Sequence, residues 1–191
     1  MKVTVKIKHT GITLVELIAT IVLLGFGLAI FTNMLIIGLQ RSGNAFDEIR
    51  TTALAQAYLD EILSRRFDEN SHPSGTPTCY LLVGPKPCSD SATFGAMMDP
   101  GEGSRNRFDD VDDYHNLDEG TDSPSGDLIL SDADDTDRIG YEGFRVLVTV
   151  EYAGDDPPIN KDPTDAKLIT VTVFEPTRSN GTEFSAYKVN F

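Results

Sequence analysis

Positive charge is scarce in this 191-residue chain. Lys and Arg number 16 against 30 Asp and Glu, which gives a formal charge of −14. Lys2, Lys6 and Lys8 stand in the first 11 residues, which hold no acid, so losing these three positive charges would take the total from −14 to −17. Phosphate binding requires a basic surface, so we expect no nucleic acid partner. The acidity is compatible with cation binding, or with a soluble and self-repelling surface.

Catalytic signatures are also missing. The chain has only three His, and one of them, His9, lies in the basic segment at the start. No Gly-x-Ser-x-Gly, His-Glu-x-x-His or glycine-rich phosphate-binding loop occurs. Paired carboxylates are frequent, but in acidic loops we expect them on a solvated face. We therefore predict no catalytic residues and no enzyme.

Cysteine is limited to Cys79 and Cys88. A Cys-only metal site needs more ligands than the sequence offers nearby. Two Cys nine positions apart can close a small loop, and disulfides persist in oxidising compartments. Two free thiols are the alternative.

One long apolar run follows Gly11. Ile12–Leu39 holds a single charged residue, Glu16. Its 28 residues would form about 42 Å of helix, more than the roughly 30 Å hydrocarbon core of a bilayer. The positive-inside rule keeps the basic leader cytoplasmic and places the rest of the chain on the other side, the periplasm in a Gram-negative bacterium. A carboxylate in such a span is costly, so Glu16 is a functional candidate.

A secretory signal peptide and a plain signal anchor are alternatives for this start. The apolar region of a signal peptide is about 7–15 residues long and precedes its cleavage site. Here the apolar run is longer, and Gly11, the candidate cleavage position, stands before the run. A signal anchor would explain length and orientation, but neither Gly11 nor Glu16.

A second helical pattern covers Ala45–Phe67 and predicts packing against a sheet. Its apolar residues form an arc, Phe46, Ile49, Ala53 and Ala57, and an adjacent row, Leu54, Tyr58 and Ile62. Glu61 and Arg65 have the spacing of an exposed i, i+4 ion pair.

The remainder predicts an α+β fold, with a long N-terminal helix packed on a small antiparallel β-sheet. Residues 71–138 predict a long, acidic, loop-rich region with short strand candidates at Tyr80–Val83 and Asp127–Leu130. Alternating patterns predict three strands of an antiparallel meander: Tyr141–Tyr152, Lys167–Glu175 and Glu183–Phe191. The expected division is a leader over 1–11, a membrane helix over 12–39 and a globular domain over 40–191.

Two acidic runs, Phe108–Gly120 and Ser131–Gly140, are candidates for calcium binding or for a charged surface. Asp132, Asp134 and Asp137 are the candidate ligands. An EF-hand is excluded, because Asp137 occupies the position that needs Gly and no Glu stands at the twelfth position of the loop. No cofactor is required, and an irregular calcium site stays open.

The start, Gly11-Ile12-Thr13-Leu14-Val15-Glu16-Leu17-Ile18, resembles the processing and methylation site of type IV pilins and type II secretion pseudopilins. Ile12 stands where the family usually has Phe. The segments ALAQAYLDEILSRRFDE, FDDVDDYHNL and KLITVTV are similar to minor pilins of the mannose-sensitive haemagglutinin (MSHA) pilus, the MshD-like group. Some pseudopilins bind calcium, which favours the calcium prediction modestly.

The resemblance implies a minor pilin assembled into a type IV pilus. A prepilin peptidase would cleave after Gly11 and methylate Ile12, inner-membrane assembly machinery would move the subunit from the membrane into a filament, and other pilins would contact its N-terminal helix. Glu16 would set the register between subunits. A type II secretion pseudopilin is one alternative. A membrane-anchored adhesin or calcium-binding protein outside a filament is another.

Overall fold

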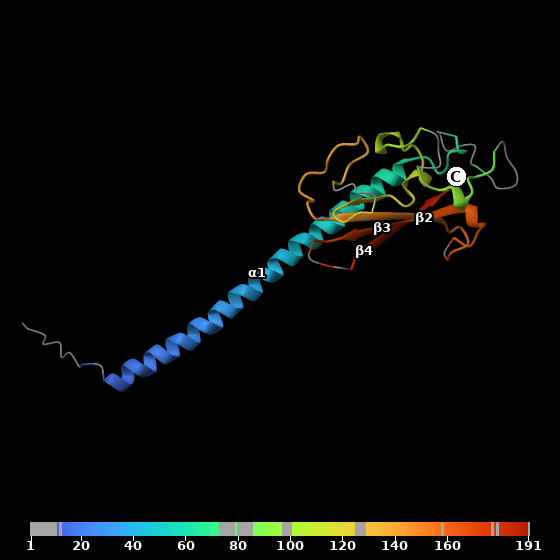
Figure 1. The fold of residues 1–191 in the computed structure, drawn as a ribbon. Helices are drawn as coiled ribbons and strands as arrows, with labels where there is room; N and C mark the ends of the chain where they lie inside the picture. The colour runs from blue at the N-terminus through green and yellow to red at the C-terminus, as the bar shows by residue number, and fades with distance from the viewer. Residues whose placement is uncertain are drawn as a thin grey trace, which may run out of the picture. The chain divides into compact units, whose positions relative to one another are not determined.

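The computed structural model describes residues 11, 13–72, 79, 86–96, 101–124, 129–157, 159–176, 178 and 180–190, without the side chains of 40–44. The chain divides into two units, one ending at Phe46 and the other beginning at Asp47. Helix α1, Leu14–Ser64, contributes residues to both (Figure 1).

Helix α1 is 51 residues long and joins the two helical segments expected from the sequence into one element. Leu, Ile, Ala, Met, Gln and Glu, which favour helix, dominate it, and Gly25 and Gly27 do not interrupt it. The helix ends at Ser64, three residues before the predicted end. There Lys188 donates from Nζ to the carbonyl oxygens of Leu63 (2.6 Å) and Arg65 (2.8 Å), which caps the helix end.

The second unit contains a four-stranded antiparallel sheet in the order β1-β2-β3-β4. Its strands are β1 (Asp118–Gly120), β2 (Arg145–Tyr152), β3 (Ala166–Phe174) and β4 (Thr182–Val189). The predicted meander is confirmed, with Val148 opposite Val171 and Val171 opposite Phe184. β2 begins four residues later than predicted. β1 was missed because it is only three residues long and carries two acids.

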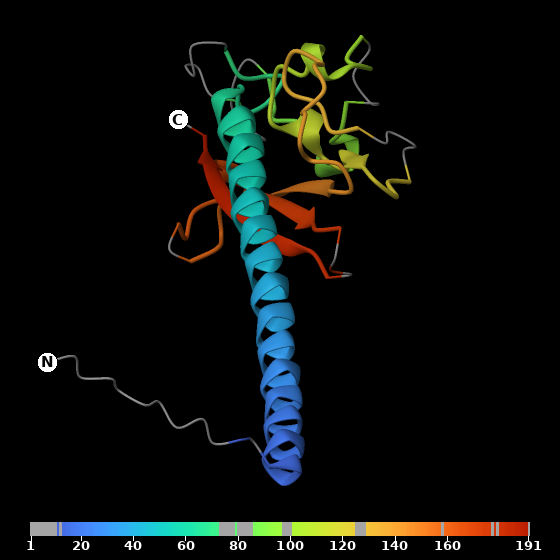
Figure 2. The same ribbon diagram turned by 90° about the vertical axis from the view of Figure 1, so that its left-hand side faces the viewer.

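The core of this unit lies between α1 and one face of the sheet (Figure 2). From the helix it takes the predicted row Leu54, Tyr58 and Ile62, and from the sheet the alternating valines of β2 and β3. The prediction that the arc through Ile49 and Ala53 is part of the buried face was wrong. Ile49 is 68% exposed, and Ala53 is also exposed. The row lies i, i+4, i+8, so it forms a single stripe that contacts the sheet.

The segment between α1 and β2 contributes to the core as well as to the surface. It contains the short 3-10 helices η1 (Ser91–Thr93), η2 (Arg105–Arg107) and η3 (Asp112–Tyr114), and a fourth, η4 (Pro163–Asp165), precedes β3. The expectation that the first acidic run is a solvated face is wrong for its buried members, which are Phe108, Asp110, Val111, Asp112, Asp113, Tyr114, Glu119 and Gly120. The apolar residues of this run anchor it, and its carboxylates are buried with them.

The two short strand candidates in the loop region lie wholly or partly outside the described residues. Tyr80–Val83 lies outside the described residues. Asp127–Leu130 lies there in part, and its described residues, Ile129 and Leu130, belong to no strand. The fold class is α+β, as predicted.

Candidate functional site

The start of α1 brings together the residues of the predicted processing site that the structure describes. Gly11 is exposed, and a Cβ added to it would meet nothing within 4 Å. Ile12 lies outside the described residues. Thr13 caps the helix: its Oγ1 accepts a hydrogen bond from the backbone N–H of Glu16 at 3.3 Å, and its carbonyl oxygen accepts one from Leu17 at 3.1 Å.

Thr13 and Glu16 therefore occupy the N-cap and N3 positions of a helix start. The pattern Thr-x-x-Glu is that of a capping box, and a carboxylate in the first turn is favoured by the positive end of the helix dipole. The sequence contained this signal for Thr13, but the prediction used only Glu16. The position of Glu16 in the first turn therefore favours the helix start of its own chain, independently of any contact between subunits.

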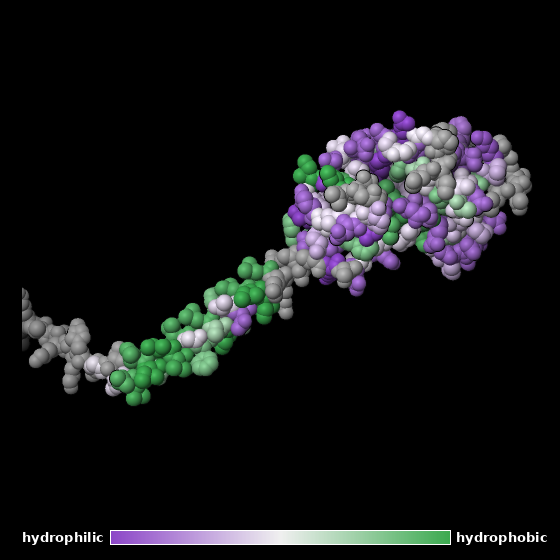
Figure 3. Space-filling view, viewed as in Figure 1, coloured by the Kyte–Doolittle hydropathy of each residue, from purple (hydrophilic) through white to green (hydrophobic). Residues whose placement is uncertain are grey.

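The segment Leu14–Leu39 of α1 is long enough and apolar enough to cross a membrane. Its large apolar side chains are exposed in the chain alone, and Figure 3 shows this stretch as a nearly continuous hydrophobic surface. A membrane anchor and a signal sequence both have this character.

The polar side chains inside this stretch bond to the helix itself. Thr20 and Thr32 donate from Oγ1 to the carbonyl oxygens of Leu17 and Leu28, each at 2.8 Å, and Asn33 donates from Nδ2 to that of Ala29 at 3.2 Å. Such bonds satisfy polar groups that would otherwise be costly in an apolar medium.

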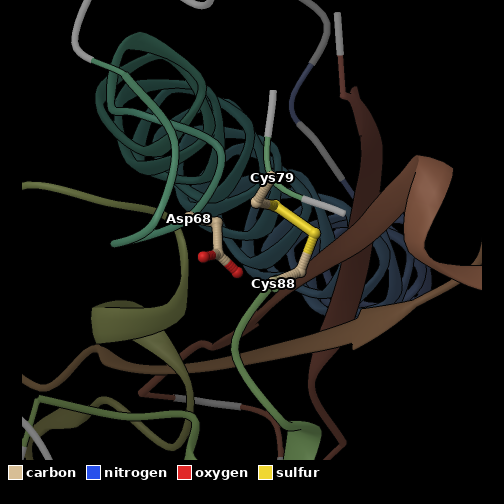
Figure 4. Close-up of side chains that lie close together, drawn as sticks. All are labelled: Asp68, Cys79 and Cys88. Carbon is tan, nitrogen blue, oxygen red and sulfur yellow. A yellow bond between two sulfur atoms is a disulfide. The ribbon is translucent and has the colours of Figure 1, made fainter. Parts of the chain in front are cut away.

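The Cys79–Cys88 disulfide is formed, as predicted. Both sulfurs are buried, and they pack beside Phe67 and Tyr152. Asp68, four residues after the end of α1, lies next to the bridge (Figure 4). The disulfide therefore fixes the chain beside the end of the helix.

Lys167 of β3 is fully buried and is the centre of a charged cluster in the second unit. Its Nζ donates to the carbonyl oxygen of Phe67 at 2.7 Å and to Oδ2 of Asp68 at 3.2 Å, and it forms a short ion pair with Asp112 of η3. We call Phe67, Asp68, Asp112 and Lys167 the Lys167 cluster. It ties together the chain after α1, the 3-10 helix η3 and the sheet.

Aromatic rings complete the surroundings of Lys167. The rings of Phe67, Phe94 and Tyr152 have their centroids 4.4, 4.9 and 5.3 Å from Nζ. An ammonium over aromatic faces is stabilised by the ring quadrupoles, and the gain is larger when the site is dry. The cluster is thus enclosed by both carboxylates and rings.

Acids outnumber bases around this cluster. Asp110 and Asp113 are buried beside Asp112 and bond to one another's backbone N–H groups. Burial, with repulsion from Asp112 and Asp113, raises the pKa of Asp110 to about 8. Burial raises the pKa of Asp112 to about 7, although Lys167 opposes that shift. Both shifts keep a proton on these carboxyls to a higher pH than on an exposed Asp.

A second charged cluster fixes the C-terminal end of the helix to the loop region. Arg105 donates from Nε to Glu61 at 2.9 Å and forms a short ion pair with Glu119, while Arg138 pairs with Glu61 at 3.4 Å. The predicted exposed pair between Glu61 and Arg65 is therefore wrong. The Glu61 side chain is only 8% exposed, because it faces the loop that carries Arg105.

The calcium candidates lie on a turn after Leu130. Asp132 accepts backbone N–H groups of Asp134 and Thr136 at 3.0 Å each, and these bonds lower its pKa. Asp137 bridges to Ser131 through the backbone. The calcium prediction for these residues stays a prediction.

Within the described part of the chain, close sets of potential metal ligands do not include these three. Ligand atoms within 4.8 Å of one another occur in three groups: Asp68, Cys79 and Cys88; Glu69, Asp109 and Asp110; and Glu102, Asp109 and Asp113. The sulfurs of the first group are bonded to each other, so they are not free to bind a metal.

The chain was compared with protein-family models, with curated proteins and with solved structures, and it matches none of them.

Proposed function

We propose that this chain is a minor subunit of a type IV pilus of the MSHA type, made as a precursor and cleaved after Gly11. The observation that carries the proposal is the order of the first turns. Gly11, the cap Thr13 and the acid Glu16 lead directly into an apolar stretch whose large apolar side chains are exposed in the chain alone. An α+β domain with a helix across an antiparallel sheet is compatible with a pilin.

In this proposal the leader and the apolar stretch act in succession. Lys2, Lys6 and Lys8 hold the N-terminus in the cytoplasm. Leu14–Leu39 anchors the precursor in the inner membrane until a prepilin peptidase removes the leader and methylates Ile12. The same stretch then packs against the helices of other subunits, which cover the side chains that are exposed in the isolated chain.

Glu16 has a specific role in that packing. An unpaired carboxylate is costly in an apolar filament core, whereas a partner cation in low dielectric attracts it. The new amine of Ile12 on a neighbouring subunit supplies that cation. Pairing only at one axial position would fix the register between subunits.

The test is the mass of the mature chain, isolated after co-expression with a prepilin peptidase. We expect loss of residues 1–11 and one added methyl on Ile12. The control is Gly11→Asp, which should block cleavage without disturbing the fold, since a side chain at Gly11 meets nothing within 4 Å. An uncleaved chain would refute the proposal and favour the membrane-anchored adhesin or calcium-binding protein.

Cleavage alone does not separate a pilin from a type II secretion pseudopilin. Deletion of the gene distinguishes the two: loss of pili favours the pilin, and loss of exoprotein release favours the pseudopilin.

A further inference from the structure

A cavity of about 400 Å³ lies at the C-terminal end of α1, within the second unit. It is bordered by the residues that follow the helix and by the end of β4, which lie side by side in Figure 2. The polar side chains important here are Arg65, Arg66, Ser71, His72 and Lys188. None of the described residues that line the cavity is Asp or Glu, in a chain whose formal charge is −14.

Two of the basic groups keep donors that their known bonds do not use. Arg65 donates from Nε to Tyr114 Oη at 3.2 Å, so its remaining guanidinium N–H groups are not engaged by that bond. Lys188 uses two of its three ammonium N–H groups to cap α1. Arg66 differs, because Glu69 and Asp109 neutralise it.

Ser71 borders the same cavity and has an unsatisfied hydroxyl. The residue is buried, and among the described residues its Oγ has no hydrogen-bond partner. Its backbone is held in place, since its N–H donates to the carbonyl oxygen of Asp68 at 2.9 Å. Buried hydroxyls normally have a partner, so a missing acceptor is informative.

We propose that this cavity binds the anionic group of a small organic ligand, a phosphate, sulfate or carboxylate. Arg65 and Lys188 provide the charge, and the hydroxyl of Ser71 donates a hydrogen bond. A charge-assisted bond from a guanidinium is among the stronger polar contacts. The volume is within the range of small-molecule sites, about 300–1,000 Å³. Phe67 and Val189 form apolar walls for the body of the ligand.

This inference is independent of filament assembly. It concerns only residues of the second unit, so it holds equally for a pilus subunit, a secretion pseudopilin or an anchored protein. Failure of cleavage after Gly11 would leave it intact.

The test is calorimetric titration of the full chain in a non-ionic detergent at low ionic strength. The probes are inorganic phosphate, sulfate and glucuronate, with glucose as the neutral control. We expect a single site with a Kd on the order of 1 mM for at least one anion, and no heat with glucose. Preference for phosphate and sulfate would identify a tetrahedral head group, and preference for glucuronate a carboxylate.

Two variants test the location of the site. Arg65→Gln should weaken anion binding about tenfold. The matched control is Arg178→Gln, which removes the same charge from an exposed residue paired with Glu175, outside the cavity, and should leave Kd within about twofold. Ser71→Ala should weaken binding without lowering Tm, since its hydroxyl has no partner to lose. If Arg65→Gln proves unstable, the Ser71→Ala variant alone tests the location of the site.

Three results would overturn the proposal. They are no anion binding up to about 50 mM, equal weakening by Arg65→Gln and Arg178→Gln, and unchanged binding in Ser71→Ala. The second would show a general effect of net charge rather than a site.

Discussion

The two parts of helix α1 share one continuous backbone but differ in the exposure of their apolar side chains. Leu28 in the first unit is 58% exposed, whereas Leu54 in the second is fully buried. Leu14–Leu39 is apolar on every side, whereas the part from Asp47 to Ser64 is mixed, with one apolar stripe buried and most of its polar residues elsewhere. A helix that is apolar all round needs a surrounding apolar medium, while a one-sided helix needs a single partner face. Within the second unit, the sheet provides that face.

The two units also differ in how they hold charge. Leu14–Leu39 contains one acid, Glu16, in its first turn. The second unit buries a lysine, an arginine and several carboxylates, and pairs most of them across elements. Buried pairs are strongly destabilising when one member is removed, because the other is left uncompensated. Stability of the second unit should therefore depend on single residues more than that of the first.

The largest effect is expected for Lys167→Met. The variant removes the cation and leaves Asp68 and Asp112 buried without it, so the free energy of unfolding should fall by about 3–5 kcal/mol. Urea unfolding of the full chain in a non-ionic detergent, followed by circular dichroism, measures this. Lys161→Met, at an exposed turn residue, is the control. Equal losses in both variants would contradict the role assigned to the Lys167 cluster.

The next largest loss of stability is expected at Leu54, and Leu28 of the same helix is its comparison. Leu54→Ala should destabilise the second unit by about 2–5 kcal/mol, because it leaves a cavity between the helix and the sheet. Leu28→Ala should change the same unfolding transition by less than about 0.5 kcal/mol. Both variants change helix propensity by the same amount, so the difference reports packing alone. A similar loss for Leu28→Ala would mean that the two units do not unfold separately.

Periodicity explains why so much of the fold was predictable. The stripe Leu54, Tyr58 and Ile62 and the alternation within β2 and β3 are local patterns, and each follows from the geometry of one element. The neighbouring arc at Ile49 was indistinguishable from that stripe by apolarity alone. Only the position of the sheet decides which of two adjacent apolar faces is buried.

The charge pairs were not predictable, because their members lie far apart in the sequence. Lys167 stands at the start of a strand, and its partners Asp112 and Asp68 lie 55 and 99 residues away in the sequence. Glu61 had a nearby candidate in Arg65 but pairs with Arg105, 44 residues away. The sequence pattern favours local pairs, whereas burial selects whichever cation the tertiary structure brings into contact.

Replacing both Cys79 and Cys88 by Ser should have a smaller effect, about 2–3 kcal/mol. The bridge closes a loop of only nine positions, so it restricts the unfolded chain less than a long loop would. Urea unfolding of the oxidised and Ser-substituted chains gives the difference. Since the bridge lies beside Asp68, a loss well above this range would show that it also holds the Lys167 cluster in place.

A pH titration in EDTA should show a further loss of stability toward alkaline pH. The pKa of Asp110 is raised to about 8 and that of Asp112 to about 7, against an unfolded value of about 3.9. The folded state therefore keeps protons that the unfolded state has already released. The resulting stability is full below about pH 4 and is lost as pH rises through 7 and 8.

We expect the free energy of unfolding to fall by about 1–2 kcal/mol between pH 6 and 8. Asp110→Asn is the control: it keeps an oxygen that can accept the backbone bonds from Asp112 and Asp113, but cannot ionise. Its stability should depend less on pH. A wild-type stability that rises from pH 6 to 8 would show that these carboxyls are ionised in the folded protein.

The smallest effect on stability is expected at the start of α1. Thr13→Ala removes the cap and should weaken the first turn by about 0.5–2 kcal/mol. Faster amide hydrogen exchange at Glu16 and Leu17, measured by NMR in detergent micelles, would report it. Thr20→Ala is the control, because it loses a hydroxyl bond within the helix but no cap.

Glu16→Ala distinguishes the two roles of the acid. If Glu16 only supports the helix start, then Thr13→Ala and Glu16→Ala should fray the first turn alike and should enter filaments equally well. If Glu16 pairs with the Ile12 amine of a neighbouring subunit, only Glu16→Ala should reduce the amount of the subunit in sheared filaments, with cleavage intact. Normal incorporation of Glu16→Ala would show that Glu16 only supports the helix start, because a fixed register between subunits requires Glu16 to contact a neighbouring subunit.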